Sequence, residues 1–161
     1  MELILRELRD EDLPVLFEQW ADPVAAQMAA FTPPDHMERD AFERRWARLR
    51  ADYTVLNRVI VVDDDVAGSI GSWGDAGERE VTYWVGRSYW GKGIATEALG
   101  AFLAVERSRP LRARVASDNV GSRRVLEKCG FRVIATDRGF AEARSAEIEE
   151  LVLRLDDPAP G

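Results

Sequence analysis

Two glycines flank Lys92 in the segment SYWGKGIATEAL, which covers residues 88–99. Gly91 and Gly93 would let backbone N–H groups approach a ligand closely, and glycine adopts dihedral angles that other residues avoid. The helix-forming residues that follow predict a helix from about Ile94 onward. Since the first amides of a helix bind anions readily, we expect this loop to hold a phosphate group.

Two common nucleotide-binding loops fit this spacing poorly. A Walker-type loop needs Ser or Thr directly after Gly-Lys, but Gly93 stands there and offers no hydroxyl for magnesium. A dinucleotide-binding loop needs a third Gly or Ala where Thr96 stands, and an acidic residue after the next strand, which residues 111–117 do not supply. The remaining interpretation is a loop for the pyrophosphate of an acyl coenzyme.

The segments on either side of the loop predict a strand before it and a helix after it. Residues 80–86, EVTYWVG, are apolar on both faces and rich in β-formers, so we expect a central strand covered on both sides. Beyond the loop, four apolar residues recur at helical spacing before Pro110: Ile94, Ala98, Phe102 and Val105.

The rest of the chain predicts one α/β (α+β) domain over residues 1–156, with a frayed tail at 157–161. We expect a mixed, mostly antiparallel sheet of about seven strands with helices on both faces. The other expected strands cover residues 2–8, 54–62, 66–73, 111–117, 131–140 and 145–155. The other expected helices cover residues 11–20, 22–31, 38–52 and 119–130.

The predicted helix 38–52 combines apolar residues with many arginines and acidic residues. An apolar stripe recurs there at helical spacing, and we favour a core-facing role over a substrate groove for its residues Phe42, Trp46, Leu49 and Tyr53. A solvated face is expected for the arginines between them, namely Arg39, Arg44, Arg45, Arg48 and Arg50.

Two motifs resemble the GNAT superfamily of N-acetyltransferases. YWVGRSYWGKGIATEAL resembles the acetyl-CoA loop of that family, Q/R-x-x-G-x-G/A, with Ser88 in place of the usual Gln or Arg. NVGSRRVLEKCGF resembles the segment in which Asn begins a helix, Ser or Ala follows three residues later, and Gly-Phe closes it. The resemblance spans nearly the whole chain and is closest to the branch of ribosomal-protein N-terminal acetyltransferases (RimJ/RimL-like).

The resemblance implies a GNAT fold with acetyl-CoA as cosubstrate and assigns candidate site residues. Those for binding the coenzyme are Trp84, Val85, Ser88, Trp90, Gly91, Lys92, Gly93, Ile94, Ala95, Thr96, Asn119 and Ser122. Glu80 is the candidate base, and a backbone N–H near Val85 is the candidate donor to the oxyanion. Many relatives carry a tyrosine acid seven residues after the helix's Asn, but Leu126 stands there, so Ser122 or a water must protonate the thiolate.

Composition narrows the range of partners. The 22 basic and 29 acidic residues give a net charge of −7, which argues against nucleic acid and suits an amine-bearing partner. With one cysteine, Cys129, and one histidine, His36, a typical zinc site is not expected, nor is any other metal. No segment reads as a signal peptide or a membrane span, so we expect a cytoplasmic protein without membrane contact. The oligomeric state stays open between a monomer and a homodimer.

The expected function is acetyl-CoA-dependent transfer of an acetyl group to a primary amine. The branch resemblance and the missing tyrosine favour an N-terminal α-amine of a protein or peptide. A polyamine or an aminoglycoside-type amine is the second interpretation, supported by the acidic net charge. A non-catalytic sensor that binds acyl-CoA is the third.

Overall fold

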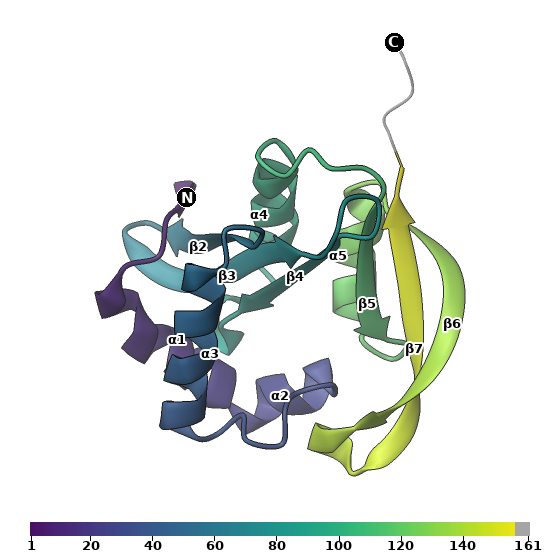
Figure 1. The fold of residues 1–161 in the computed structure, drawn as a ribbon, viewed down its shortest axis with the longest axis horizontal. Coiled ribbons are helices and arrows are strands. Elements are labelled where there is room, and N and C mark those ends of the chain that lie inside the picture. Colours follow the sequence, from purple (N-terminus) through teal and green to yellow (C-terminus); the bar gives the residue numbers. More distant parts are fainter. Residues whose placement is uncertain (157–161) are drawn as a thin grey trace.

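Seven strands form one mixed sheet in the order β1-β2-β3-β4-β5-β7-β6 (Figure 1). The computed structural model describes residues 1–156, so the predicted tail at 157–161 lies outside the described residues. The strands are β1 Leu3–Arg6, β2 Leu56–Val62, β3 Asp65–Trp73, β4 Glu80–Val85, β5 Leu111–Ala116, β6 Arg132–Ala141 and β7 Ala146–Leu155. The predicted α/β architecture and its strand count are confirmed.

Five α-helices cover the two faces of the sheet, as predicted. They are α1 Leu13–Ala21, α2 Pro23–Ala29, α3 Arg39–Ala51, α4 Ile94–Leu103 and α5 Val120–Lys128. Short 3-10 turns cover Asp10–Asp12, Arg87–Tyr89 and Glu142–Arg144. In the described part of the chain, no helix is long and apolar enough to cross a bilayer.

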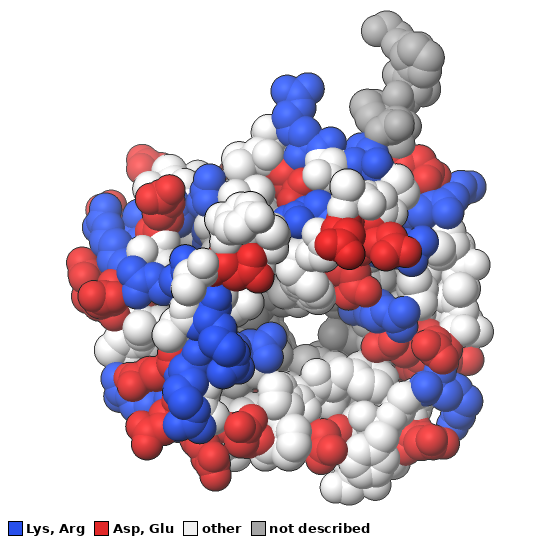
Figure 2. Space-filling model, in the orientation of Figure 1, with Lys and Arg blue, Asp and Glu red and all other residues white. Residues whose placement is uncertain are grey.

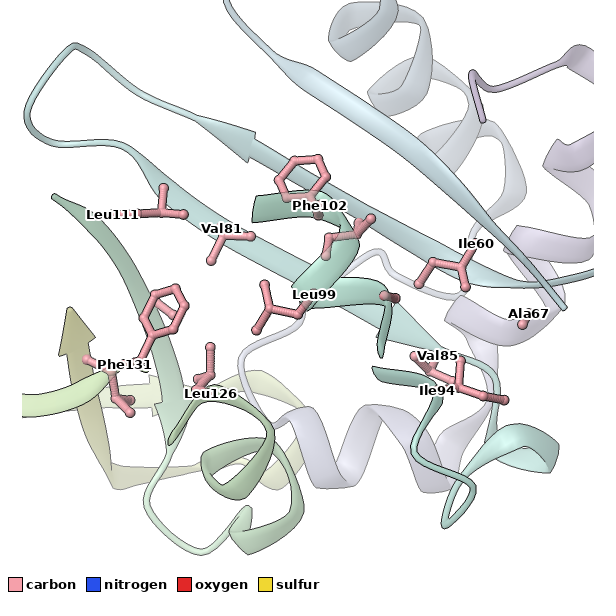
Figure 3. Close-up of a cluster of buried hydrophobic side chains, with 14 of the residues drawn as sticks. Ile60, Ala67, Val81, Val85, Ile94, Leu99, Phe102, Leu111, Leu126 and Phe131 are labelled. Atoms are coloured by element: carbon pink, nitrogen blue, oxygen red, sulfur yellow. The ribbon is translucent and has the colours of Figure 1, made fainter. Parts of the chain in front are cut away.

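Neighbouring residues of β2 show how the two faces are filled, because successive side chains of a strand point to opposite sides. Ile60 packs into the cluster that contains Leu99 and Phe102 of α4 and Leu126 of α5 (Figure 3). Val59 and Val61 pack into a second cluster with residues of α1 and α3, namely Leu16, Phe42 and Trp46. The sheet therefore separates an α4/α5 side from an α1/α3 side.

The stripe predicted along α3 is correct for three of its four residues. Phe42 and Trp46 are buried, and Leu49 packs against them. Tyr53 is 97% exposed, contrary to the prediction. The helix ends at Ala51, and the side chain of Asp52 accepts hydrogen bonds from the Thr54 backbone and hydroxyl, which turns the chain away before Tyr53 can join the stripe.

β4 and β5 are the one pair of parallel neighbours in the described sheet, and they share one register position, Glu80 opposite Arg112. The β1/β2 pair, by comparison, shares four positions. Beyond Glu80 the two strands diverge, and Figure 1 shows the space that opens between them. The sheet thus stays continuous at one end of β4 and opens at the other.

A buried charged group ties the closed end of this opening together. Glu106 follows α4 and is 5% exposed. Its carboxylate accepts hydrogen bonds from the Ser72 hydroxyl of β3 and from Arg79 Nε at 3.1 Å. Burial alone would raise the pKa of Glu106, but hydrogen bonds from Ser72, Ser108 and Arg79 outweigh it and lower that pKa.

We predict that Glu106→Gln lowers the free energy of unfolding by about 3 kcal/mol, because it leaves the largely buried side chain of Arg79 without its countercharge. Since the pKa of Glu106 is lowered by folding, this stabilisation is present above the ordinary glutamic acid pKa of about 4.3 and is lost as the pH falls through the lower folded value. Urea unfolding of both proteins at several pH values measures the difference.

The exposed Glu127, which pairs with Arg123 one helical turn away, provides the control. Glu127→Gln should cost less than about 0.5 kcal/mol, as is usual for an exposed pair within a helix. Equal effects of the two substitutions would show that the Glu106 pair does not hold the closed end of the opening.

Candidate active site

The loop between β4 and α4 presents a row of unpaired backbone amides. Gly91 and Gly93 have φ angles of 77° and 75°, in the left-handed region that favours glycine. Among the described residues, the amides of residues 91–96 donate to no acceptor. An added Cβ at either glycine would meet no other atom within 4 Å, so the space in front of these amides is open. The loop has the donors that an anion requires.

A cavity of about 610 Å³, called here the α4/α5 cavity, lies between this loop, the end of β4 and the start of α5. Most of the residues predicted to bind the coenzyme line it: Trp84, Val85, Trp90, Gly91, Gly93, Ile94, Ala95, Thr96, Asn119 and Ser122. Ser88 and Lys92 do not. Ser88 is exposed in the turn Arg87–Tyr89, and the Lys92 ammonium lies over the Tyr89 ring at 5.8 Å.

Two cationic residues of α5 also line the α4/α5 cavity, and the sequence motifs did not identify them. Arg124 and Lys128 are four residues apart, so they lie on the same face of α5. Their spacing in RRVLEK was the available signal. They add positive charge to a cavity whose loop already offers backbone donors.

The divergence of β4 and β5 leaves a second kind of donor inside the opening. Gly86 N–H donates to Ala67 O across the β3/β4 ladder at 2.8 Å, and Val85 lies opposite Gly68 at the next register position. In an antiparallel ladder, alternate residues turn their N–H and C=O groups away from the partner strand. The Val85 N–H therefore points toward the opening, beside the carbonyl that accepts from Trp90 Nε1 at 2.9 Å.

A second cavity of about 560 Å³, called here the α1/α3 cavity, lies on the other side of the opening. Figure 2 shows the hollow on this face, between α3 and β5 and above α2. Much of its wall is aromatic and comes from α1, α3, β4, β6 and the segment after α2; these residues are Trp20, Phe31, Phe42, Trp46, Trp84 and Phe140. Part of the α3 stripe thus serves both the core and the cavity.

Five residues line both cavities, namely Ala29, Tyr83, Trp84, Asn119 and Ser122, and they define the junction. Asn119 Oδ1 accepts from the Ser122 N–H at 3.2 Å and caps α5. The hydroxyls of Tyr83 and Ser122 lie 2.7 Å apart. Burial raises the pKa of Tyr83 to about 12, although the hydrogen bond with Ser122 opposes the rise.

The sequence did not single out Tyr83, because an aromatic residue in an apolar strand reads as core. Its partner Ser122 lies 39 residues further along the chain, beyond the reach of any local pattern. The signal that was available is a hydroxyl on the strand that leads directly into the glycine loop.

Glu80, the predicted base, lies at the closed end of the opening and lines neither cavity. Its carboxylate is 3.4 Å from Arg114 Nε. Cys129 also lines neither cavity, and burial raises the pKa of its thiol. Within residues 1–156, no group of three or more His, Cys, Asp and Glu side chains could hold a metal ion.

The acetyltransferase (GNAT) domain family matches residues 2–132 of the chain. The chain belongs to the GNAT family. It is an N-acetyltransferase, and acetyl-CoA is the cosubstrate of that fold. The family resemblance stated from the two motifs is therefore confirmed.

Known GNAT proteins resemble the chain over nearly its whole length. The uncharacterized N-acetyltransferase p20 of Bacillus licheniformis is 26% identical over 167 residues, which cover 95% of this chain and 92% of p20. The structure of RimL, a ribosomal L7/L12 α-N-protein acetyltransferase in complex with coenzyme A, superposes with a TM-score of 0.80 at 15% identity, covering 96% and 94% of the two chains.

A structure with a different acceptor is about as similar. The spermidine N-acetyltransferase of Vibrio cholerae, in complex with CoA and spermine, superposes with a TM-score of 0.78 at 17% identity, covering 94% of this chain and 95% of that one. At such identities both likenesses describe the fold alone. The predicted RimJ/RimL-like branch is thus one of several GNAT branches that share this architecture.

The α4/α5 cavity fits the chemistry of acetyl-CoA. A diphosphate needs several donors and positive charge, which the amides of residues 91–96, Arg124 and Lys128 provide. The apolar side chains of Trp84, Val85 and Ile94 line the same cavity and suit the less polar arm of the coenzyme. When bound, acetyl-CoA supplies an activated acyl group as a thioester.

We predict that Gly93→Ala weakens acetyl-CoA binding about tenfold, because a Cβ forces the N-cap of α4 out of its left-handed conformation and misdirects the loop amides. The same strain should lower the free energy of unfolding by about 1 kcal/mol. Isothermal titration with CoA and thermal unfolding measure the two effects separately.

Gly100→Ala is the matched control, because Gly100 lies within α4 and an added Cβ there meets no atom within 4 Å. This substitution should raise stability by up to about 1 kcal/mol through helix propensity and leave CoA affinity unchanged. Unaltered affinity in Gly93→Ala would exclude the loop as the diphosphate site.

Proposed function

We propose that this enzyme acetylates the α-amine at the N-terminus of a protein or peptide. The proposal rests on the observation that the carboxylates lining the two cavities are paired with arginines. Within residues 1–156, the carboxylates that line the two cavities are Asp118 and Glu150. Asp118 is ion-paired with Arg144, which lowers the pKa of Asp118, and Glu150 accepts from Arg114 at 2.8 Å. Neither carboxylate is free to remove a proton from the acceptor.

The need for a base depends strongly on the class of amine. Deprotonating a lysine side chain with a pKa near 10.4 costs roughly 4 to 5 kcal/mol near pH 7. Deprotonating an α-amine with a pKa near 8 costs only about 1 kcal/mol. A site without a free carboxylate therefore suits an α-amine, which loses its proton to water without much help.

Acyl transfer also needs a donor to the developing oxyanion and a proton for the departing thiolate. We assign the first role to the Val85 N–H, which points into the opening between β4 and β5. We assign the second to Ser122, whose hydroxyl lies at the junction and would relay a proton: it gives its own to the thiolate and regains one from the ammonium that forms on the attacking amine, directly or through water. The predicted residues of the glycine loop, with Asn119, complete the proposed coenzyme site.

Tyr83 is proposed as a positioning residue. The Tyr83 hydroxyl lies 3.2 Å from the Ser122 carbonyl oxygen and 2.7 Å from Ser122 Oγ, and when it donates to Oγ the Ser122 proton is left available for the thiolate. Burial raises the pKa of Tyr83 to about 12, so Tyr83 stays protonated near neutral pH and remains a hydrogen-bond donor to Ser122. Its contribution is the orientation of Ser122.

Glu80 keeps a lesser proposed role as a base that acts through water. Its pairing with Arg114 and its place outside both cavities argue against direct contact with the acceptor.

The proposal includes a cytoplasmic location, because acetyl-CoA and the N-termini of newly made proteins are both present there.

We predict that a peptide with a free α-amine and a blocked lysine is acetylated with a kcat/KM about 100-fold higher near pH 7 than the same peptide with a blocked α-amine and a free lysine. The ratio should fall as the pH rises toward the pKa of lysine. Release of free CoA thiol at saturating acetyl-CoA measures both rates.

Other outcomes identify the alternative functions. Faster turnover of spermidine or an aminoglycoside than of any peptide would replace the α-amine proposal with a small-molecule one. Saturable CoA binding without amine-dependent thiol release would indicate a sensor. Glu80→Gln should lower the peptide rate most near neutral pH, and an unchanged pH profile would remove Glu80 from the mechanism.

A double-mutant cycle tests the hydroxyl pair. Ser122→Ala should lower kcat about 100-fold and Tyr83→Phe about tenfold, with little change in KM for either substrate, because the effects fall on the transition state. If Tyr83 acts through Ser122, adding Tyr83→Phe to Ser122→Ala costs less than about twofold more. Independent, multiplicative effects would contradict the positioning role.

A further inference from the structure

Arg45 of α3 is exposed, as its spacing in the sequence predicted, and it also lines the α1/α3 cavity. Its guanidinium carbon lies 5.6 Å from the centroid of the Trp20 ring, which lines the same cavity. Among residues 1–156, Arg45 forms no ion pair and no hydrogen bond. The cavity therefore has a cationic side chain in one wall without a countercharge in contact.

The charges around Arg45 leave this cation uncompensated. On the same helix, Arg39 pairs with Glu43, and Arg50 pairs with Asp10. Burial lowers the pKa of Arg45, the like charge of Arg48 acts in the same direction, and Asp35 partly opposes them. Figure 2 shows basic side chains gathered over α3 beside the hollow, on a chain whose net charge is −7.

A buried hydroxyl in the same cavity also lacks a partner. Thr32, in the segment after α2, is 4% exposed, and its Oγ1 has no hydrogen-bond partner in the described structure. Thr32 and Arg45 both line the α1/α3 cavity. Because buried polar groups are almost always paired, this hydroxyl has capacity for a hydrogen bond to a ligand or to water in the cavity.

A third polar group in the cavity has the opposite requirement. Gln19 donates from Nε2 to Val66 O at 3.1 Å, while its Oε1 is buried without a partner. An unpartnered amide oxygen accepts an N–H, such as the backbone amide of a peptide. The wall thus offers donors at Arg45 and Thr32 and an acceptor at Gln19, set among aromatic side chains.

We propose that this wall is a subsite for a carboxylate carried a few bonds from the amine that is acetylated. The proposal rests on the proposed function, which puts that amine at the junction of Tyr83 and Ser122. Two acceptors have this chemistry: a peptide with Asp or Glu within its first three residues, and a free acidic amino acid. A polyamine does not have it, because a second cation would meet the unpaired guanidinium of Arg45.

The positive charge favours recognition of a carboxylate even though Arg45 is exposed. The Trp20 ring covers one side of its guanidinium, and a charge-assisted hydrogen bond to a carboxylate is stronger than a neutral one. Arg114, the other arginine of the cavity, is already engaged by Glu80, Asp137 and Glu150. Arg45 is consequently the cation with capacity for an incoming anion.

The test compares C-terminally amidated tripeptides that carry a single Glu at position one, two or three with their Gln counterparts. For at least one position, kcat/KM for the Glu peptide should exceed that for the Gln peptide about tenfold at low salt, mainly through KM. The advantage should shrink at about 0.5 M NaCl, because salt screens a partly exposed pair. Free glutamate and glutamine, assayed in parallel, distinguish an amino acid acceptor from a peptide acceptor.

Substitutions in the cavity wall test whether Arg45 and Thr32 cause the preference for Glu over Gln. Arg45→Met keeps most of the side-chain stem and should reduce the Glu/Gln ratio to below about twofold, and Thr32→Val should reduce it by a smaller factor. Arg44→Met is the matched control, since Arg44 is the adjacent arginine of α3 and does not line the cavity. The ratio should survive that substitution.

Binding provides a readout that does not depend on turnover. Isothermal titration of N-acetylated Glu and Gln tripeptides, in the absence of acetyl-CoA, should reproduce the tenfold preference and its loss in Arg45→Met. Equal acetylation and equal binding of all Glu and Gln acceptors would overturn the carboxylate subsite while leaving the α-amine proposal in place. Failure of every amine to release thiol would instead overturn the proposed function.

Discussion

The site depends on the single register position that β4 and β5 share, Glu80 opposite Arg112. Two parallel strands that pair at one position separate beyond it. Backbone N–H and C=O groups that would form hydrogen bonds in a longer ladder therefore remain unpaired between the strands. The Val85 N–H is one of these groups, and the two cavities meet in the space that the separation creates. The antiparallel pairs on both sides keep the opening from spreading through the sheet.

The opening is stabilised by contacts that also shape the site. Trp84 Nε1 donates to Gln19 O at 2.9 Å, which joins β4 to α1, and the Trp84 ring packs against Trp20 with centroids 4.7 Å apart. Trp90 Nε1 ties the glycine loop back to Val85 O. Each aromatic residue thus fixes one border of the reaction site while lining a cavity, so stability and function use the same side chains.

Much of this architecture follows from local sequence signals. The paired glycines, the Asn119 cap and the alternation of strands and helices depend on neighbours within a few residues, and they predicted the loop, the start of α5 and the fold. The Tyr83–Ser122 contact, the place of Arg45 in the cavity wall and the arginine partners of Asp118 and Glu150 were not predictable in the same way, because they involve residues brought together by the fold. Tyr53 shows the limit of helical spacing at the end of a helix, because α3 ends at Ala51 and the turn at Asp52 removes Tyr53 from the stripe.

The junction of the two cavities has a consequence for the order of chemical events. The two cavities meet at the five residues that line both, so two reactants can occupy them at the same time. Cys129 lines neither cavity, and the hydroxyls of Tyr83 and Ser122 at the junction lie within hydrogen-bond distance of each other. This arrangement suits direct transfer of the acetyl group within one ternary complex of the protein and both reactants, without an acyl-enzyme intermediate.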